Sequence, residues 1–111
     1  MALTNIAPVQ LTTALVTKHT VGSGQQATLI ELWWLNKDAS NRLTTVHFVP
    51  NGGSPTDENM VVELQSGNAL RPGEDMVREY SVHLTVGYTI QVKADANSQV
   101  TMWGGITEEA A

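Results

Sequence analysis

The histidines are the first residues to test for chemistry, because an imidazole can act as a general base or as a metal ligand. His19, His47 and His83 stand far apart in the chain and form neither a His-x-His nor a His-Glu-x-x-His spacing. A zinc site would therefore have to be assembled across strands, with a carboxylate as the third ligand. His47 alternates with Thr45 and Val49, as a partly buried strand position does. We expect three unrelated histidines in strands or turns, and no bound metal.

The carboxylates and the nucleophile motifs are equally uninformative about catalysis. The chain has 11 Asp and Glu residues, but no expected strand presents two that clearly converge as in a glycosidase. Several Asp residues fall at turns or strand starts, where Asp is common because it bonds to its own backbone: Asp38, Asp57, Asp75 and Asp95. No nucleophile elbow, Walker loop or dinucleotide fingerprint is present. We therefore expect no enzymatic activity and no cofactor.

The tryptophans are more informative, since three of the six aromatic residues are Trp. Trp103 is expected on the polar side of its strand, beside Thr101 and before two glycines. A large ring that points away from the core is a candidate interface anchor, because Trp is enriched at the centres of protein contacts. The alternative is a bulge at the glycines that turns Trp103 into the core. Trp33 and Trp34 are adjacent, so we expect one of them in the core and the other covered elsewhere.

Composition excludes several classes of protein. The absence of cysteine excludes a disulfide scaffold, thiolate metal sites and a Cys nucleophile. The net charge of −5, with 11 acidic and 6 basic residues, disfavours binding to nucleic acid or to an anionic membrane. The sequence shows neither the features of a signal peptide nor an apolar run of about 18 residues. We expect a soluble protein that folds in a reducing cytoplasm.

The elements that would position these side chains are β-strands. Of the 111 residues, 29 are Thr, Val or Ile, which pack well on a pleated surface. Turn signals recur every ten or so residues, as in sandwiches and barrels. They separate candidate strands at 9–17, 26–36, 42–49, 60–65, 75–83, 88–94 and 99–107. The pattern predicts an all-β fold: an antiparallel, jelly-roll-like β-sandwich of about seven or eight strands.

Alternation of side chains assigns faces to these strands. Segments 88–94 and 99–107 alternate apolar and polar residues, which predicts one buried and one solvated face. Segment 26–36 is apolar on both sides: regular alternation places Leu32 and Trp34 on one face and Leu29, Trp33 and Leu35 on the other. This strand is therefore either central and covered twice, or one of its faces meets another protein.

The order of turns and strands resembles a known family. The resemblance covers about residues 9–108. It is carried by the glycine turn at 22–24, the Thr-Asp-Glu-Asn loop at 56–59, and the segments 27–36, 49–54, 61–64, 70–74, 84–94 and 105–108. Together they are similar to small jelly-roll proteins from the structural modules of tailed bacteriophages, and closest to the capsid decoration proteins of short-tailed phages. These proteins are also called cement or staple proteins.

The resemblance implies a structural protein of the virion, made in the host bacterial cytoplasm. Such a protein folds alone, binds the outer surface of an assembled head in many copies, and clamps neighbouring subunits of the major capsid protein. We expect a homodimer, with a trimer as the alternative, and neither nucleic acid nor membrane as a partner. A net negative charge agrees with a position outside the packaged DNA.

Three parts of the chain are expected: an N-terminal arm at 1–8, one sandwich domain at 9–108 and a tail at 109–111. The arm is expected to lie on a neighbouring subunit, the alternative being a disordered terminus. Two groups of residues are candidates for contact with a partner. The apolar candidates are Leu3, Ile6, Trp33, Trp34 and Trp103, and the charged candidates are Arg42, Arg71 and Arg78.

Two other functions stay open at this point. Jelly rolls also carry sugar-binding sites, so a tail- or fibre-associated carbohydrate- or receptor-binding module is the main alternative. It would use Trp103 with the loop residues Asn97 and Gln99. The other is a cupin-like metal enzyme, which shares the double-sheet architecture. Fold alone does not choose among these functions.

Overall fold

The computed structural model describes residues 2–56, 58–63 and 70–111, and the side chains of these residues apart from 2–4 and 62–63. Within these ranges the chain forms eight β-strands and no helix. The strands are β1 (Ala2–Gln10), β2 (Val16–Thr20), β3 (Gln25–Asn36), β4 (Thr44–Val49), β5 (Met60–Glu63), β6 (Asp75–Leu84), β7 (Thr89–Ala94) and β8 (Val100–Ala110). No helix in the described ranges is long and apolar enough to cross a membrane.

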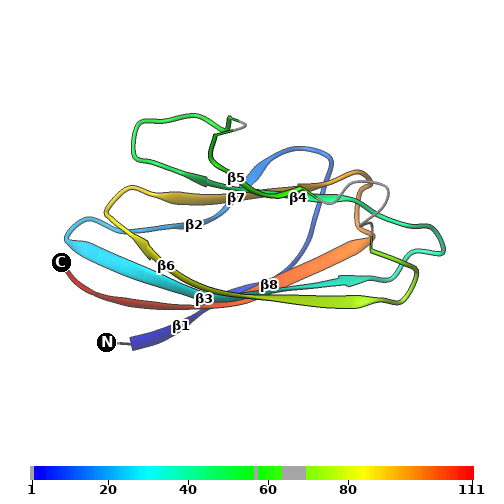
Figure 1. Cartoon of the computed structure of the whole chain (residues 1–111), viewed down its shortest axis with the longest axis horizontal. Helices are drawn as coiled ribbons and strands as arrows, with labels where there is room; N and C mark the ends of the chain where they lie inside the picture. Colours follow the sequence, from blue (N-terminus) through cyan, green and yellow to red (C-terminus); the bar gives the residue numbers. More distant parts are fainter. Residues whose placement is uncertain (1, 57, 64–69) are drawn as a thin grey trace.

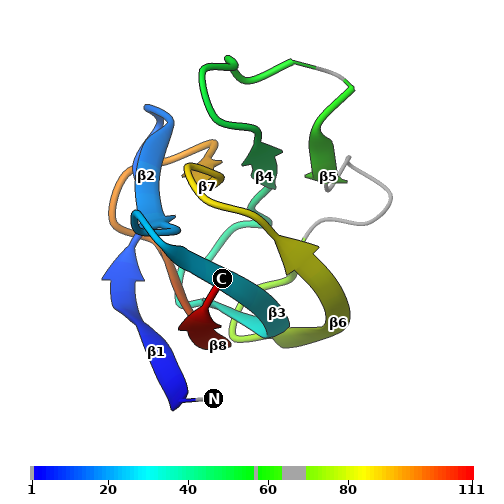
Figure 2. The same ribbon diagram turned by 90° about the vertical axis from the view of Figure 1, so that its left-hand side faces the viewer.

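The strands form two packed antiparallel sheets, with the orders β1-β8-β3-β6 and β2-β7-β4-β5 (Figure 1). Figure 2 shows the same two layers from one end of the sandwich. The pairs β4–β5, β3–β6, β2–β7 and β1–β8 are nested one around the other along the chain. This nesting is the strand order of a jelly roll. The prediction of an all-β antiparallel sandwich with about seven or eight strands is confirmed.

The expected segments from residue 26 onward agree with β3 to β8, except that residues 64–65 lie outside the described part. The first expected segment, 9–17, is wrong, because the chain leaves one sheet and enters the other between residues 11 and 15. Leu11 N–H donates to the Val100 carbonyl (2.7 Å) and the Thr12 carbonyl accepts from Ala94 N–H (2.8 Å). These bonds tie the crossing to strands of both sheets.

The described residues of the expected N-terminal arm, 2–8, lie in β1 and pair with β8 of the same chain. They therefore form part of the sandwich and do not project from it. β1 is an edge strand, and its pairing shifts register between Ile6 and Val9. Pro8 lies within this shift, which suits an edge, since proline has no N–H to give to a neighbouring strand.

The core fills the space between the sheets. Its largest fully buried side chains are Trp34, Leu11, Leu29, Leu32, Leu70, Leu84, Ile90, Met102 and Ile106. The expected faces of 88–94 and 99–107 are confirmed: Ile90, Met102 and Ile106 point into the core, while Trp103 does not.

Strand β3 departs from regular alternation. Its pairing with both β6 and β8 shifts register between Leu29 and Glu31. Leu29 is buried before the shift, and Leu32 and Trp34 are buried after it. Regular alternation would have put the glutamate on the core side together with Leu29, where an unpaired carboxylate is costly. The shift keeps Glu31 outside and determines which of the adjacent tryptophans is buried.

Candidate functional site

The two tryptophans outside the core form one pair. Trp33 of β3 lies directly opposite Trp103 of β8 in the strand register. Their ring centroids are 5.9 Å apart and their planes differ by 10°, so the indoles are stacked. Both side chains are partly exposed on the outer side of the sheet β1-β8-β3-β6. The expected outward position of Trp103 is therefore confirmed, and a slip into the core does not occur.

Apolar side chains extend this pair into a patch. Ile30, Leu35 and Val77 are 39%, 36% and 41% exposed. Val77 of β6 is opposite Trp33, and Leu35 lies two residues further along β3 on the same side. We call these five residues, Ile30, Trp33, Leu35, Val77 and Trp103, the aromatic face. Contiguous apolar patches on small soluble proteins mark interaction sites more often than single exposed residues do.

A hollow opens beside the stacked indoles. It is lined by Asn5, Ile30, Glu31, Trp33, Trp103, Gly104 and Gly105. Gly105 opens it, because this outward position of β8 carries no side chain, whereas a side chain at Gly104 would point inward toward Ile6 and Leu32. A Cβ on Gly104 would lie 2.7 Å from the Glu31 carbonyl oxygen, so only glycine lets β8 approach β3 this closely. The irregularity at the glycines lies on the partner strand: the β3–β8 pairing shifts between Leu29 and Glu31, opposite Ile106 and Gly105, and Trp103 stays outward.

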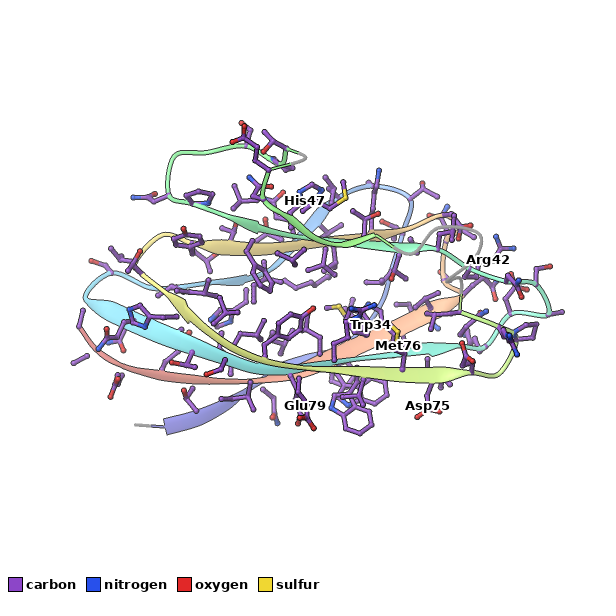
Figure 3. The ribbon with its side chains drawn as sticks, viewed as in Figure 1. Trp34, Arg42, His47, Asp75, Met76 and Glu79 are labelled. Carbon is purple, nitrogen blue, oxygen red and sulfur yellow. The ribbon has the colours of Figure 1, made fainter. Side chains whose placement is uncertain are left out.

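The charges around the aromatic face have one sign. Glu31, Asp75, Glu79 and Glu109 occupy outward positions of β3, β6 and β8. Figure 3 shows Asp75 and Glu79 projecting from the outer side, away from Trp34 and Met76 between the sheets. None of the four strands places a Lys or Arg at an outward position, and Lys37 follows the end of β3. The patch is therefore apolar and acidic.

The remaining apolar contact candidates are not on this surface. Ile6 is 2% exposed and Trp34 is 0% exposed, so both belong to the core and present no surface to a partner. One of the adjacent residues Trp33 and Trp34 was expected in the core, and that residue is Trp34. The side chain of Leu3 lies outside the described residues, and its backbone pairs with Thr107.

The three arginines are scattered. Arg42 donates from Nε to Asp38 Oδ2 (2.6 Å), and its Nη1 lies 3.7 Å from Asp95 Oδ2. The hydrogen bond with Arg42 lowers the pKa of Asp38 and raises that of the guanidinium. Arg42 is thus already paired within the chain. Arg71 is exposed in a tight turn, and Arg78 is exposed on the edge strand β6, in register with the core residue Leu32.

The histidines occupy three separate places, as expected. His19 pairs with Glu108 where β2 and β8 close one edge of the sandwich. His47 is buried beneath the β4–β5 loop, with Nδ1 2.8 Å from Asn59 Oδ1, and His83 is exposed on β6. Within the described ranges, no three His, Asp or Glu residues come together in a way that could hold a metal ion.

The residues of the sugar-binding alternative do not come together. Asn97 Oδ1 accepts a hydrogen bond from Thr13 N–H (3.0 Å), which ties the β7–β8 loop to the crossing between the sheets. Gln99 is four residues from Trp103, about 13 Å along an extended chain. The polar side chains that flank the indoles are instead those of Asn5 and Glu31, and neither residue was among the candidates from the sequence.

Comparison with known proteins adds information about the fold. No protein-family model matches the chain, and no curated protein matches its sequence. A chain from Bacillus endospore appendages, described as disulfide-linked pili, has a TM-score of 0.58 at 9% identity, over 98% of this chain and 87% of that one. The Drosophila NLP core, described in terms of pentamer formation and histone binding, has a TM-score of 0.51 at 20% identity, over 91% and 96%.

A chain of the IBDV viral particle also shares the fold. Its TM-score is 0.51 at 7% identity, and the match covers 96% of this chain but only 30% of the viral one. The sandwich is therefore equivalent to one part of that larger protein. At these identities the likeness of all three structures concerns the fold alone, so the function has to be argued from the surface.

Proposed function

We propose that this chain is a non-enzymatic structural protein of a virion, a decoration protein that binds the outer surface of a tailed-phage head. The observation that carries the proposal is the aromatic face. Trp33 and Trp103 are stacked on the outside of a sheet whose inner side already packs the core. Tryptophan at the centre of an apolar patch is typical of a contact that contributes most of the binding energy. In this proposal the partner is the major capsid protein.

The proposal gains support from the settings in which this fold occurs. The three similar structures are described as pili, as a pentamer-forming core and as a viral particle. Each of these descriptions concerns an assembly of several subunits. A decoration protein uses the same principle, since simultaneous contacts to several subunits raise the effective affinity of weak single contacts.

Charge and shape agree with a position outside the head. The net charge of −5 is unfavourable next to packaged DNA and neutral to favourable outside it. A compact sandwich with extents of 44 × 26 × 20 Å can cover a junction between neighbouring subunits. By lowering the free energy of the closed lattice, such a clamp opposes the internal pressure of the packaged genome.

The expected homodimer needs a surface other than the aromatic face. A two-fold contact brings identical patches together, which here would juxtapose two sets of Glu31, Asp75, Glu79 and Glu109. Like charges facing each other across an interface cost several kcal/mol. We therefore assign the aromatic face to a different protein, and any contact between copies to another part of the molecule.

The test is binding to purified undecorated heads, measured by co-sedimentation before and after head expansion. The wild-type chain is expected to sediment with heads of at least one stage. Trp103→Ala is expected to weaken binding by about thirtyfold or more, as for an interface residue worth about 2 kcal/mol. Gln91→Ala, on the outer side of the other sheet, is the matched control and should bind normally.

Two results would overturn the proposal. One is a wild-type chain that binds heads at no stage, and the other is equal binding by the Trp103 and Gln91 variants. The copy number in purified virions is an independent check. A number comparable to that of the major capsid protein is expected, whereas a handful of copies would place the chain in the tail or a fibre.

A further inference from the structure

We infer that the hollow beside the stacked indoles receives a basic side chain, preferably an arginine, presented by the partner protein. The identity of that partner rests on the proposed function, but the chemistry of the hollow can be tested without it. The opposite surface must then carry a cation surrounded by apolar residues.

The lining of the hollow has the two features that a guanidinium binds. One wall is aromatic, formed by Trp33 and Trp103, and the adjacent residue Glu31 contributes a carboxylate. A cation over an indole face is attracted by the ring quadrupole, and Trp is the best of the aromatic residues at this. Arginine also stacks flat on aromatic rings and donates in a planar fork to carboxylates, which lysine cannot do.

A repulsion between two like charges in the sheet also favours a cation as the occupant of the hollow. Glu31 of β3 lies directly opposite Glu79 of β6, and like charges at such positions destabilise a sheet. No Lys or Arg of the four strands lies outward to offset them. A surface that violates a rule of sheet pairing is expected to have a functional reason. A cation in the hollow would lie beside Glu31 and offset part of its repulsion with Glu79.

The same charges disfavour other occupants. A second copy of this face is repelled by its own carboxylates, and nucleic acid or an anionic lipid surface is repelled in the same way. A sugar could stack on the indoles, but among the other residues that line the hollow only the side chains of Asn5 and Glu31 could form hydrogen bonds with its hydroxyls. Above Gly105 the Glu31 Cγ and Oε1 lie 3.7 Å from the position that a Cβ would take, which brings the carboxylate to the hollow where a partner's side chain would enter.

The test uses the whole chain labelled with ¹⁵N and the peptide acetyl-Gly-Arg-Gly-amide as the probe. Titration is expected to shift the indole N–H signals of Trp33 and Trp103, and to leave that of the buried Trp34 in place. The matched peptide with citrulline, which has the same shape but no charge, is expected to shift them much less. Glu31→Gln should weaken the response about twofold to fivefold, the size of an exposed charge or cation–π contact.

Glu58→Gln is the control, since it removes the same charge from an exposed position in the loop between β4 and β5. It is expected to respond as the wild type does. Equal responses to the arginine and citrulline peptides, no response to either, or an unaltered response in Glu31→Gln would overturn the inference. A glucose or galactose titration that shifts the same indole signals more strongly would also overturn it, in favour of a sugar.

Failure of this inference is distinguishable from failure of the proposed function. A chain that binds the arginine peptide but no heads has a basic partner other than a capsid. A chain that binds heads but shows no preference for the arginine peptide uses its aromatic face without the cation. If the chain binds heads and also prefers the arginine peptide, Glu31→Gln is expected to weaken head binding as well. The expected loss of affinity is again about twofold to fivefold for each bound copy.

Discussion

The outer sides of the two sheets differ sharply, although both belong to the same sandwich. On β2-β7-β4-β5 most of the outward residues are polar, namely Thr17, Thr45, Thr89, Gln91 and Lys93, and the apolar Val49 opposite Thr89 is buried. The β4–β5 loop covers part of this side, and buries His47 beneath it (Figure 3). On β1-β8-β3-β6 the outward side carries two stacked tryptophans, three exposed aliphatic residues and only acidic charges.

The difference shows which part of the surface is needed for folding alone. An antiparallel sheet with one solvated side is stable with polar residues there, and the sheet β2-β7-β4-β5 follows this rule. The other sheet does not need an aromatic outer side for its own stability, since its inner side already buries Trp34, Met102 and Ile106. This contrast is what supports the proposal that the aromatic face contacts a partner.

Replacing each of the adjacent tryptophans gives the largest expected effect on stability. Trp34→Ala should lower the free energy of unfolding by about 3–5 kcal/mol, as for a large buried side chain. Trp33→Ala should lower it by only about 1 kcal/mol, the worth of a stacked pair on the surface. Denaturant unfolding of both variants measures this difference. Equal losses of stability would mean that the aromatic face contributes to folding as the core does. The two outer sides would then not differ in their importance for stability.

The floor of the hollow gives the next largest effect. Gly104→Ala places a Cβ 2.7 Å from the Glu31 carbonyl oxygen and 2.9 Å from Leu32 Cδ2, so it should cost about 1–3 kcal/mol. Gly105→Ala has no contact shorter than 3.7 Å and should be close to neutral for folding. Thermal unfolding of the pair measures the contrast, and similar stabilities would show that β8 does not lie so close to β3.

The acidic surroundings of the exposed indoles should be visible in fluorescence. Caesium, a cationic quencher, should quench the emission more than iodide does at equal ionic strength, by on the order of twofold, because the local potential concentrates cations. Neutralising Glu31 and Glu79 together by Gln should reduce the preference. The double variant Trp33→Ala and Trp103→Ala leaves only the buried Trp34, and should resist both quenchers. A preference for iodide would contradict the charge assignment.

The smallest expected effect concerns Tyr80, on the inner side of β6. Its hydroxyl is buried and has no hydrogen-bond partner in the described part of the chain. Burial raises the pKa of Tyr80 above 10.0. The folded state thus favours the neutral phenol, and the resulting contribution to stability is complete below the unfolded pKa and is lost as the pH rises through the folded one.

Tyr80→Phe should therefore be about 0–1 kcal/mol more stable than the wild type at neutral pH, since it removes an unpaired hydroxyl. It should also lose less stability between about pH 9 and 11. Urea unfolding across this range measures both effects. A variant that is clearly less stable at neutral pH would show that the hydroxyl has a partner. Tyr88→Phe, at a partly buried position in the connection between β6 and β7, is the control.

Much of the architecture could be predicted from the sequence. The strands from residue 26 onward, the buried side of β7 and β8, and the outward position of Trp103 all follow from alternation and turn signals. The boundaries of the first two strands could not be predicted, because residues 11–15 continue the alternating pattern while the chain crosses between the sheets. Local pattern carries no information about such a crossing.

The candidate site could be predicted only in part. Trp33 and Trp103 were each selected, but they are 70 positions apart, and only the pairing of β3 with β8 brings them together. Glu31 and Glu79 were missed for the same reason, since their conflict exists only in the register of β3 with β6. Ile6 was selected as a surface residue because its segment reads as an arm, and the pairing of β1 with β8 places it in the core.

The register shift in β3 has a further consequence. Because side chains alternate with a period of two, a slip by one residue exchanges the two sides of a strand. If β3 ran on from Leu29 at the same length but without this shift, Trp33 would turn toward the core and Trp34 toward solvent. Single substitutions change the aromatic face one contact at a time, whereas loss of the shift would replace it whole. The composition of the outer side is thus set by the register of β3 as well as by its side chains.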